Sequence, residues 1–391
     1  MQMVVLALLL MPASIAPAAG AEVTIGYLHG PRAQEPLSLV EVPAENDGRE
    51  GAELAIEDNN TTGRFLNQSF SMVTAMVDED GDAGAQALAL AEQGASFVVA
   101  DLAADALVKA ADAGRERGLL FFNIGAADDR LREEDCRPNV IHVAPSHSML
   151  ADGLAQYLVW KQWRRWLLVE GSHPEDRLFG DALRRAAKRF GAEIVEERIF
   201  EDKGGARQTD SGVVQVQRQI PVLTQEAPEY DVLVAADESE VFAAYLPYRT
   251  WDPRPVAGSA GLVPTSWHAS HGQWGALQMH SRFQKRFSRF MTALDMQAWS
   301  AVRIVGEAAT RTGSTEPSAI TAFIKGPELG MGAYKGQKLT IRDWNLQVRQ
   351  PILLTDGRMV VSVSPQEGFL HQVSELDTLG VDRPETRCSL P

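Results

Sequence analysis

The strongest constraint on the fold is an alternation of short apolar runs with amphipathic stretches that recurs along most of the 391 residues. The first series predicts strands at Val23–Leu28, Phe70–Val77, Phe97–Asp101 and Leu119–Ile124. Apolar residues at helical spacing lie between them, at Gly48–Asn59, Asp82–Gln93 and Ala104–Arg115. Strands and helices that alternate in this way form βαβ units with a parallel sheet. We therefore expect an α/β unit in the first third of the chain.

A second series of the same kind implies a second lobe. It comprises a helix at His147–Trp163, a strand at Trp166–Glu170, a helix at Pro174–Phe190 and strands at Glu193–Phe200, Asp231–Ala235 and Pro255–Ala260. A chain of this length with 45% apolar residues can form two hydrophobic cores. The expected fold class is therefore α/β with two lobes.

The last third departs from this alternation. Residues 278–312 show helical spacing, with an aromatic stripe at Phe283, Phe287 and Phe290 that is typical of a core-facing surface. Residues 339–363 alternate apolar and polar side chains, which predicts an antiparallel ribbon. The glycine-containing stretch 202–224 is expected to begin as an exposed loop.

The N-terminus has the pattern of a secretion signal. An apolar run at Val4–Met11 is followed by small residues that end in Ala19-Gly20-Ala21. This pattern predicts a signal peptide at residues 1–21, cleavage before Glu22 and a periplasmic protein. No later segment has about 18 uninterrupted apolar residues, so we expect no membrane insertion.

The net charge of -15 disfavours nucleic acids and anionic membranes as partners and favours cationic ligands. The short basic and aromatic stretch Trp160–Trp166 ends a helical pattern, and we interpret it as a solvated helix end. No P-loop, G-x-S-x-G elbow, H-E-x-x-H pair or G-x-G-x-x-G after the first strand is present, so no enzyme is expected and no cofactor is predicted. A hydrolase built on an α/β fold of this kind is one alternative to a non-enzymatic function.

The two cysteines, Cys136 and Cys388, lack the short spacing of zinc or redox motifs. In an oxidising compartment such a pair is expected to form one disulfide. Two buried free thiols are the alternative.

Several longer stretches carry a more specific resemblance. They are Pro43–Gly48, Asp58–Leu66, Arg349–Pro351, Pro365–Leu370 and Leu376–Gly380. With the two βα series and the export signal, the chain resembles the type I periplasmic binding proteins, the group that contains leucine/isoleucine/valine binders. These stretches look like the branch associated with PQQ-dependent alcohol dehydrogenase systems.

The resemblance implies the substrate-binding component of an ABC importer, a monomer that delivers a small solute to an inner-membrane permease. A periplasmic sensor that signals to a membrane kinase is the alternative. Two Rossmann-like lobes would be joined by three crossings of the chain. Lobe one would contain residues 22–143 plus 255–335, and lobe two residues 144–254 plus 336–391.

In such sheets ligands bind beyond the carboxyl ends of the strands, and a hinge closes the lobes on the ligand. The loops at these strand ends supply the candidate ligand-binding residues: Asp101, Ala103, Gly125, Ala127, Asp128, Ser172, His173, Phe179, Asp237, Glu238, Trp267 and His268. Amino-acid-binding relatives have hydroxyl side chains in the third and fourth loops of lobe one. Here those loops have carboxylates nearby and no hydroxyls, which argues against amino-acid specificity.

Three of the acids, Asp101, Asp128 and Asp237, form a candidate site for a hard cation such as a lanthanide, because such ions bind six or more oxygen atoms. The alternative is that acids at these turns cap helix N-termini. His268 and His271 are weaker metal candidates, since two histidines do not complete a site.

Overall fold

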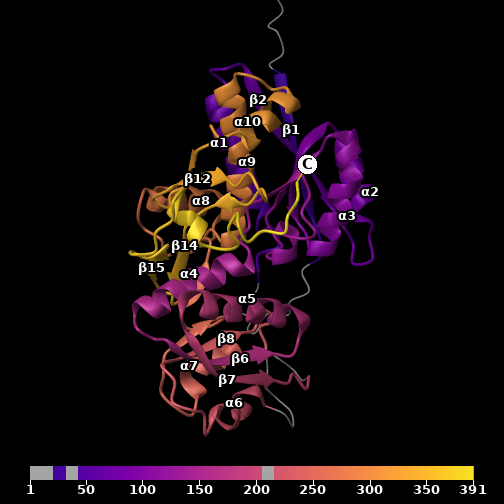
Figure 1. Ribbon diagram of the computed structural model, residues 1–391. Helices are drawn as coiled ribbons and strands as arrows, with labels where there is room; N and C mark the ends of the chain where they lie inside the picture. The colour runs from indigo at the N-terminus through magenta and orange to yellow at the C-terminus, as the bar shows by residue number, and fades with distance from the viewer. Residues whose placement is uncertain (1–20, 32–42, 205–214, 391) are drawn as a thin grey trace, which may run out of the picture.

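The computed structural model describes residues 21–31, 43–204 and 215–390. It consists of two lobes, each with a parallel β-sheet between layers of helices, and lobe one lies above lobe two in Figure 1. The predicted signal peptide lies outside the described residues except for Ala21, the first residue of β1. No helix among the described residues is long and apolar enough to cross a membrane.

The sheet of lobe one has five strands in the order β2-β1-β3-β4-β5, and all neighbouring strands are parallel. Its strands are β1 (Ala21–His29), β2 (Gln68–Met76), β3 (Ala95–Asp101), β4 (Leu120–Asn123) and β5 (Val140–His142). Four of them were predicted. β5 was not predicted, because three residues are too few to show a period.

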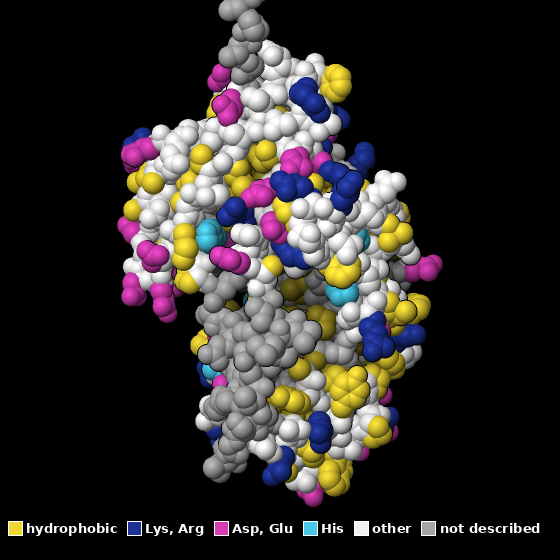
Figure 2. All heavy atoms as spheres, turned by 180° about the vertical axis from the view of Figure 1, so that it is seen from behind, with side chains coloured by type: hydrophobic (Ala, Val, Ile, Leu, Met, Phe, Trp, Pro, Cys, Tyr) yellow, Lys and Arg dark blue, Asp and Glu magenta, His cyan; other side chains and the backbone are white. Residues whose placement is uncertain are grey.

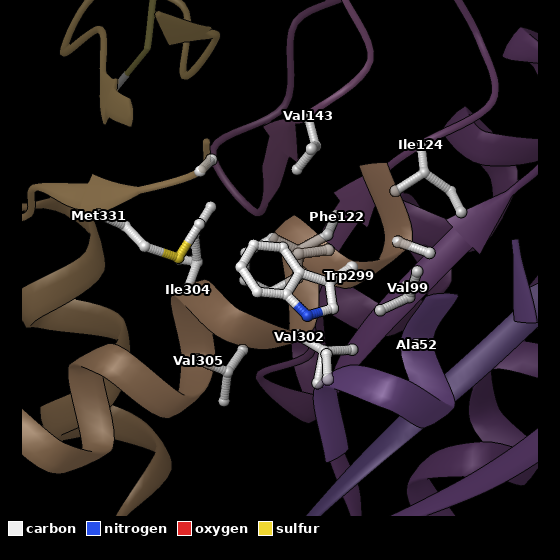
Figure 3. Close-up of a cluster of buried hydrophobic side chains, with 14 of the residues drawn as sticks. Ala52, Val99, Phe122, Ile124, Val143, Trp299, Val302, Ile304, Val305 and Met331 are labelled. Atoms are coloured by element: carbon white, nitrogen blue, oxygen red, sulfur yellow. The ribbon is translucent and has the colours of Figure 1, made fainter. Parts of the chain in front are cut away.

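Helices cover both faces of this sheet. One face packs against α1 (Arg49–Gly63), α8 (Ala276–Phe287), α9 (Ala293–Thr312) and α10 (Pro317–Lys325). The other packs against α2 (Ala83–Glu92) and α3 (Ala104–Gly114). In the first of these cores Trp299 lies among Phe122 and Val99 of the sheet and Met331 of the C-terminal part (Figure 3). Segments from the first and last thirds of the chain therefore form one core.

Lobe two has a four-stranded parallel sheet in the order β7-β6-β8-β9. Its strands are β6 (Arg165–Gly171), β7 (Glu193–Phe200), β8 (Val232–Ala236) and β9 (Val256–Gly258). Alternate side chains of β6 face opposite layers, because side chains in a strand alternate between faces. Trp166 packs with α4 (His147–Trp160) and α5 (Pro174–Phe190), whereas Leu167 packs with α6 (Val216–Thr224) and α7 (Leu246–Arg249).

Two small antiparallel sheets join the lobes, and the antiparallel ribbon predicted over residues 339–363 forms part of both. One contains β10 (Val263–Thr265), β14 (Ile352–Thr355) and β15 (Val360–Ser364), and the other contains β11 (Met331–Gly332), β12 (Lys338–Ile341) and β13 (Val348–Arg349). Leu353 packs in the core of lobe one, while its neighbours Ile352 and Leu354 pack in the core of lobe two. β14 is thus shared between the cores.

Two of the predicted lobe boundaries differ from the structure. The predicted strand Pro255–Ala260 was assigned to lobe one, but β9 pairs with β8 in the sheet of lobe two. Residues 338–349 were assigned to lobe two, but Leu339, Leu346 and Val348 pack in the core of lobe one. Sequence periodicity identifies a strand but not the sheet that it joins, since a local pattern carries no information on the pairing partner.

The predicted long helix at residues 278–312 is two helices. Ser288 ends α8 in the left-handed conformation, with φ 61°, and Thr292 begins α9 through a capping box with Asp295. The break separates the aromatic stripe: Phe283 is fully buried, whereas Phe290 is 62% exposed.

Candidate functional site

The candidate site is the region between the carboxyl edges of the two parallel sheets. Loops after β3 and β4 reach this region from lobe one, and loops after β6 and β8 reach it from lobe two. The waist between the lobes is hollowed in the space-filling view (Figure 2). Ligands of open α/β sheets bind at such edges, because the loops there are free to vary.

On the lobe one side, Asp101 and Gly125 lie close together at the ends of β3 and β4. A Cβ atom on Gly125 would lie 2.9 Å from Asp101 Oδ1 and 3.1 Å from the backbone nitrogen of Leu102. Glycine therefore lets the two loops approach each other. Ala103 is the exposed N-cap of α3, and no side chain caps this helix. The first turn of an uncapped helix presents N–H groups and a partial positive charge.

Asn123 shapes the loop after β4, and the sequence analysis did not identify it. Its Oδ1 accepts hydrogen bonds from the backbone N–H groups of Gly125 and Ala126, at 3.2 and 3.0 Å, while its Nδ2 donates to Ala126 O at 2.8 Å. Asn123 is fully buried. A buried amide at the end of an apolar strand is the signal that could have identified it.

The rest of this loop joins the first crossing between the lobes. Ala127 O accepts a hydrogen bond from the backbone N–H of His147 at 2.9 Å. Asp128 pairs with Arg130 at 3.8 Å, and its neighbour Asp129 accepts hydrogen bonds from the backbone and hydroxyl of Ser148. Asp129 thus holds the N-terminus of α4 against the loop of lobe one, whereas Asp128 pairs within that loop.

On the lobe two side, His173 and Ser172 contact the segment after β7. His173 Nε2 lies 2.9 Å from Asp202 Oδ2, and the backbone N–H of Asp202 donates to Ser172 Oγ at 3.1 Å. The hydrogen bond to Asp202 raises the pKa of His173 above its ordinary value. His173 is also the N-cap of α5 and forms a capping box with Asp176.

Asp237 is a structural cap. Its carboxylate accepts hydrogen bonds from the backbone N–H groups of Val241, Phe242 and Ala243 at 2.9, 2.8 and 2.6 Å. The residue is 3% exposed, and burial raises its pKa. Asp237 therefore acts as a cap, which was the alternative to a metal ligand, because its oxygen atoms face the backbone of its own loop.

His147 begins α4; its backbone N–H donates to Ala127 O of lobe one, while its side chain contacts residues of lobe two. Its Nε2 lies 3.8 Å from Glu238 Oε2, and its ring packs on Phe179, with 5.9 Å between ring centroids. Burial lowers the pKa of His147, but the contact with Glu238 outweighs burial, and the net shift is upward. Glu238 also accepts a hydrogen bond from Ser259 Oγ at 3.3 Å. From the sequence, His147 was predicted only as the first residue of a helix.

Trp267 lies elsewhere than predicted. It is 1% exposed in the core of lobe one, where its ring packs against His271 and His280 with centroid separations of 5.2 and 5.0 Å. The adjacent His268 is half-buried, and its Nδ1 lies 2.7 Å from Ser270 Oγ. Burial lowers the pKa of both His268 and His271. Trp267 thus packs in a core and does not line the cleft, whereas the role of His268 in ligand binding stays a prediction.

The predicted metal set is not assembled. Within residues 21–31, 43–204 and 215–390, no group of three or more His, Cys, Asp or Glu side chains is arranged to hold a metal ion. Asp237 is engaged by its own loop, and Asp128 pairs with Arg130. The acids were interpreted as one cluster because all follow strands, but Asp101 and Asp128 follow strands of the lobe one sheet, whereas Asp237 follows a strand of the lobe two sheet.

Comparisons with known proteins define the class of fold. A family model described as periplasmic binding protein matches residues 39–215. No curated protein matches the sequence. Many solved structures match the fold, which is α/β with two lobes and parallel sheets, as in the type I periplasmic binding proteins.

Three of these structures illustrate the similarity. A branched-chain amino acid ABC transporter periplasmic ligand-binding protein from Burkholderia xenovorans has 17% identity and a TM-score of 0.71, with 94% of this chain and 99% of that chain covered. An ABC transporter substrate-binding protein from Desulfitobacterium hafniense in complex with Leu has 17% identity and a TM-score of 0.66, with 86% and 98% covered. A solute-binding protein from R. palustris in complex with benzoate has 13% identity and a TM-score of 0.65, with 95% and 100% covered.

Proposed function

We propose that this chain is the periplasmic solute-binding component of an ABC importer and that it captures a small organic carboxylate, such as an amino acid, between its lobes. The observation that carries the proposal is the pair of facing strand edges, with an uncapped helix N-terminus on one side and a polar histidine and carboxylate pair on the other. Solved proteins of this fold include transporter components that hold Leu and benzoate. These transport proteins favour import over the alternative of a sensor.

The ligand class follows from charge. The uncapped N-terminus of α3 favours an anionic group, because its N–H groups and dipole attract negative charge. Asp101 and Glu238, one from each lobe, favour a cationic group such as an ammonium. An α-amino acid carries both groups. The absence of hydroxyl side chains from the loops of lobe one was interpreted above as evidence against amino-acid specificity. This proposal revises that interpretation, since backbone N–H groups can bind a carboxylate without side-chain hydroxyls.

Specific parts of the earlier expectation stay predictions. They are the link to PQQ-dependent alcohol oxidation, the cleavage site near Ala21, docking to a permease, the monomeric state and the absence of enzymatic activity. The lanthanide cargo has no support from the described residues, because they form no metal site.

A thermal-unfolding screen tests the proposal. The mature protein is mixed with α-amino acids, benzoate and a trivalent lanthanide in separate samples. A ligand at 100 times its Kd stabilises the folded state by about 2.7 kcal/mol, so a true ligand raises the Tm. We expect a shift with at least one amino acid or aromatic carboxylate. A shift with the lanthanide alone, or with none of these, would contradict the proposed ligand class.

A substitution at the N-cap of α3 tests the binding mode. In Ala103→Asp the new carboxylate caps the helix, which should stabilise the fold by about 1 kcal/mol. The same carboxylate occupies the position proposed for the ligand, so affinity should fall by about tenfold or more, as loss of one charge-assisted hydrogen bond predicts. Titration calorimetry measures the affinity.

The matched control is Glu316→Asp at the N-cap of α10, which also lacks a side-chain cap. It should stabilise the fold similarly and leave the affinity unchanged. An unchanged affinity in Ala103→Asp would show that the carboxylate does not bind at α3.

A further inference from the structure

The C-terminal segment passes from one lobe to the other. Leu379 is fully buried in the core of lobe two, whereas Leu390 packs against the core of lobe one. Figure 1 shows this yellow end of the chain rising from the level of α4 to the C-terminus beside lobe one. We call residues 380–388 the C-terminal strap.

Buried charges hold the strap on lobe two. The backbone N–H of Gly380 donates to Asp152 Oδ2 at 2.8 Å, and Asp152 is fully buried in α4. Gly380 O accepts hydrogen bonds from Arg185 and Arg189 of α5 at 3.2 and 2.6 Å. The two arginines also pair with Asp152 at 3.0 and 2.8 Å. This end of the strap is therefore part of lobe two.

A disulfide and a buried carboxylate hold the other end on lobe one. Cys388 is bonded to Cys136, as the sequence analysis predicted. Glu133, 3% exposed, accepts hydrogen bonds from the backbone N–H of Arg387 at 2.6 Å and from Thr386 Oγ1 at 3.1 Å. The link at this end is covalent.

A cavity of about 640 Å³ lies beneath the strap. It is lined by the loop after β4 in lobe one, by α5 of lobe two and by Val381, Glu385 and Arg387 of the strap itself. Within the strap, the backbone N–H of Glu385 donates to Asp382 O at 2.9 Å and closes a turn. Glu385 also pairs with Arg185 at 3.1 Å. Opening this turn would therefore lengthen the strap.

We propose that the C-terminal strap is a fourth, disulfide-closed connection that limits how far the lobes separate. The eight Cα-to-Cα steps from Gly380 to Cys388 span at most about 29 Å when fully extended, at about 3.6 Å per step. Separation of the anchors must first open the turn and break the contact between Glu385 and Arg185. Beyond that length further opening requires rupture of the disulfide or release of Gly380 from its contacts with lobe two. The inference is independent of the ligand.

Distances between spin labels in the ligand-free protein test this proposal. Labels are attached through a non-cysteine amino acid at two exposed positions, Glu116 in lobe one and Lys188 in lobe two. Pulsed electron paramagnetic resonance then measures the distribution of distances between the two spin labels. In Cys136→Ser/Cys388→Ser we expect the distribution to shift to longer distances and to broaden relative to the wild type.

A second variant separates the tether from the stabilising effect of the disulfide. A four-residue Gly-Ser insertion after Arg383 keeps both cysteines and lengthens the strap, so the same shift to longer distances is expected. The matched control is Glu385→Gln, which weakens the contact with Arg185 but preserves strap length and disulfide, and its maximum distance should equal that of the wild type. Circular dichroism checks that every variant is folded.

An unchanged distribution in the folded insertion variant would overturn the proposal, as would equal distributions in the wild type and the double serine variant. No ligand enters these measurements, so the outcome is separate from that of the proposed binding function.

Discussion

Lys335 is a buried cation at the junction of the lobes. It is 3% exposed, and its Nζ donates to Gln350 Oε1 at 2.6 Å. Gln350 Nε2 in turn donates to Val143 O at 2.6 Å, in the first crossing between the lobes. Burial lowers the pKa of Lys335 from its ordinary 10.5 to about 7. His271 is the titratable neighbour, and the charge of Lys335 lowers its pKa further.

This shift predicts a pH dependence of stability. Between pH 7 and 10.5 the unfolded chain holds a proton that the folded chain has released, so the free energy of unfolding rises with pH, by up to about 1.4 kcal/mol per pH unit. Lys335→Met removes this contribution. Urea unfolding at pH 7, 8 and 9 should therefore show a steeper rise for the wild type than for the variant. Parallel profiles would contradict the shifted pKa.

Asp237 gives a second test at the scale of single residues. Asn at this position has only one acceptor oxygen. At least one of the three backbone N–H groups that Asp237 binds would then lose its partner. An unsatisfied buried donor costs about 1–3 kcal/mol, so Asp237→Asn should lower the free energy of unfolding by this amount. Urea unfolding measures it, with the exposed Asp80→Asn as control. Equal stabilities would argue that the cap contributes little.

Among the elements, α1 and α9 pack closely in lobe one. A Cβ atom on Gly51 of α1 would lie 2.0 Å from the carbonyl oxygen of Asp295 in α9. Asp295 Oδ1 also accepts a hydrogen bond from the backbone N–H of Gly48, just before α1, at 2.9 Å. The glycine permits the contact, because backbone atoms cannot move aside as a flexible side chain can.

Gly51→Ala should therefore destabilise the protein. Alanine gains about 1 kcal/mol in helix propensity, but overpacking of this kind costs about 1–3 kcal/mol or more. Urea unfolding should show a net loss of stability. Gly332→Ala is the control, since a Cβ atom there meets nothing within 4 Å, and it should be nearly neutral. A variant at Gly51 as stable as the control would mean that the helices shift apart without cost.

At the scale of the whole molecule, polar residues of the C-terminal part hold the lobes together. Asp377 Oδ1 accepts hydrogen bonds from Arg342 and Arg349 at 2.9 and 2.8 Å, and Asp377 is fully buried. Gln347 binds the first crossing through Nε2, which donates to His142 O at 2.9 Å and to Ala144 O at 3.2 Å. Two of the stretches that carried the family resemblance thus build the junction of the lobes, at a distance in sequence from the candidate site.

The disulfide should also raise the free energy of unfolding of the whole chain. Cys136 and Cys388 are separated by 252 residues, and closing so long a loop in the unfolded chain stabilises the folded state by about 5 kcal/mol in the chain-entropy model. Cys136→Ser/Cys388→Ser should lower the urea midpoint accordingly, while the Gly-Ser insertion keeps most of the stability. Coincident midpoints for the wild type and the serine variant would contradict this expectation.

The sequence by itself determined the local elements and the fold class. Eight of the nine strands in the two parallel sheets follow from short apolar runs, because periodicity is a property of neighbouring residues. The helix ends at Gly191 and Gly313 follow from glycine in the left-handed conformation. The cysteine pairing also followed, since two cysteines allow only one intramolecular disulfide.

Only the tertiary structure decided which acid is a cap, which histidine joins the lobes and which sheet receives β9. Asp237 and Glu238 are adjacent in sequence, yet one faces its own loop and the other approaches His147. The contact between Glu238 and His147 is set by the distance between segments about ninety residues apart in the chain. That distance arises from packing of the cores, which local patterns of charge and polarity do not encode.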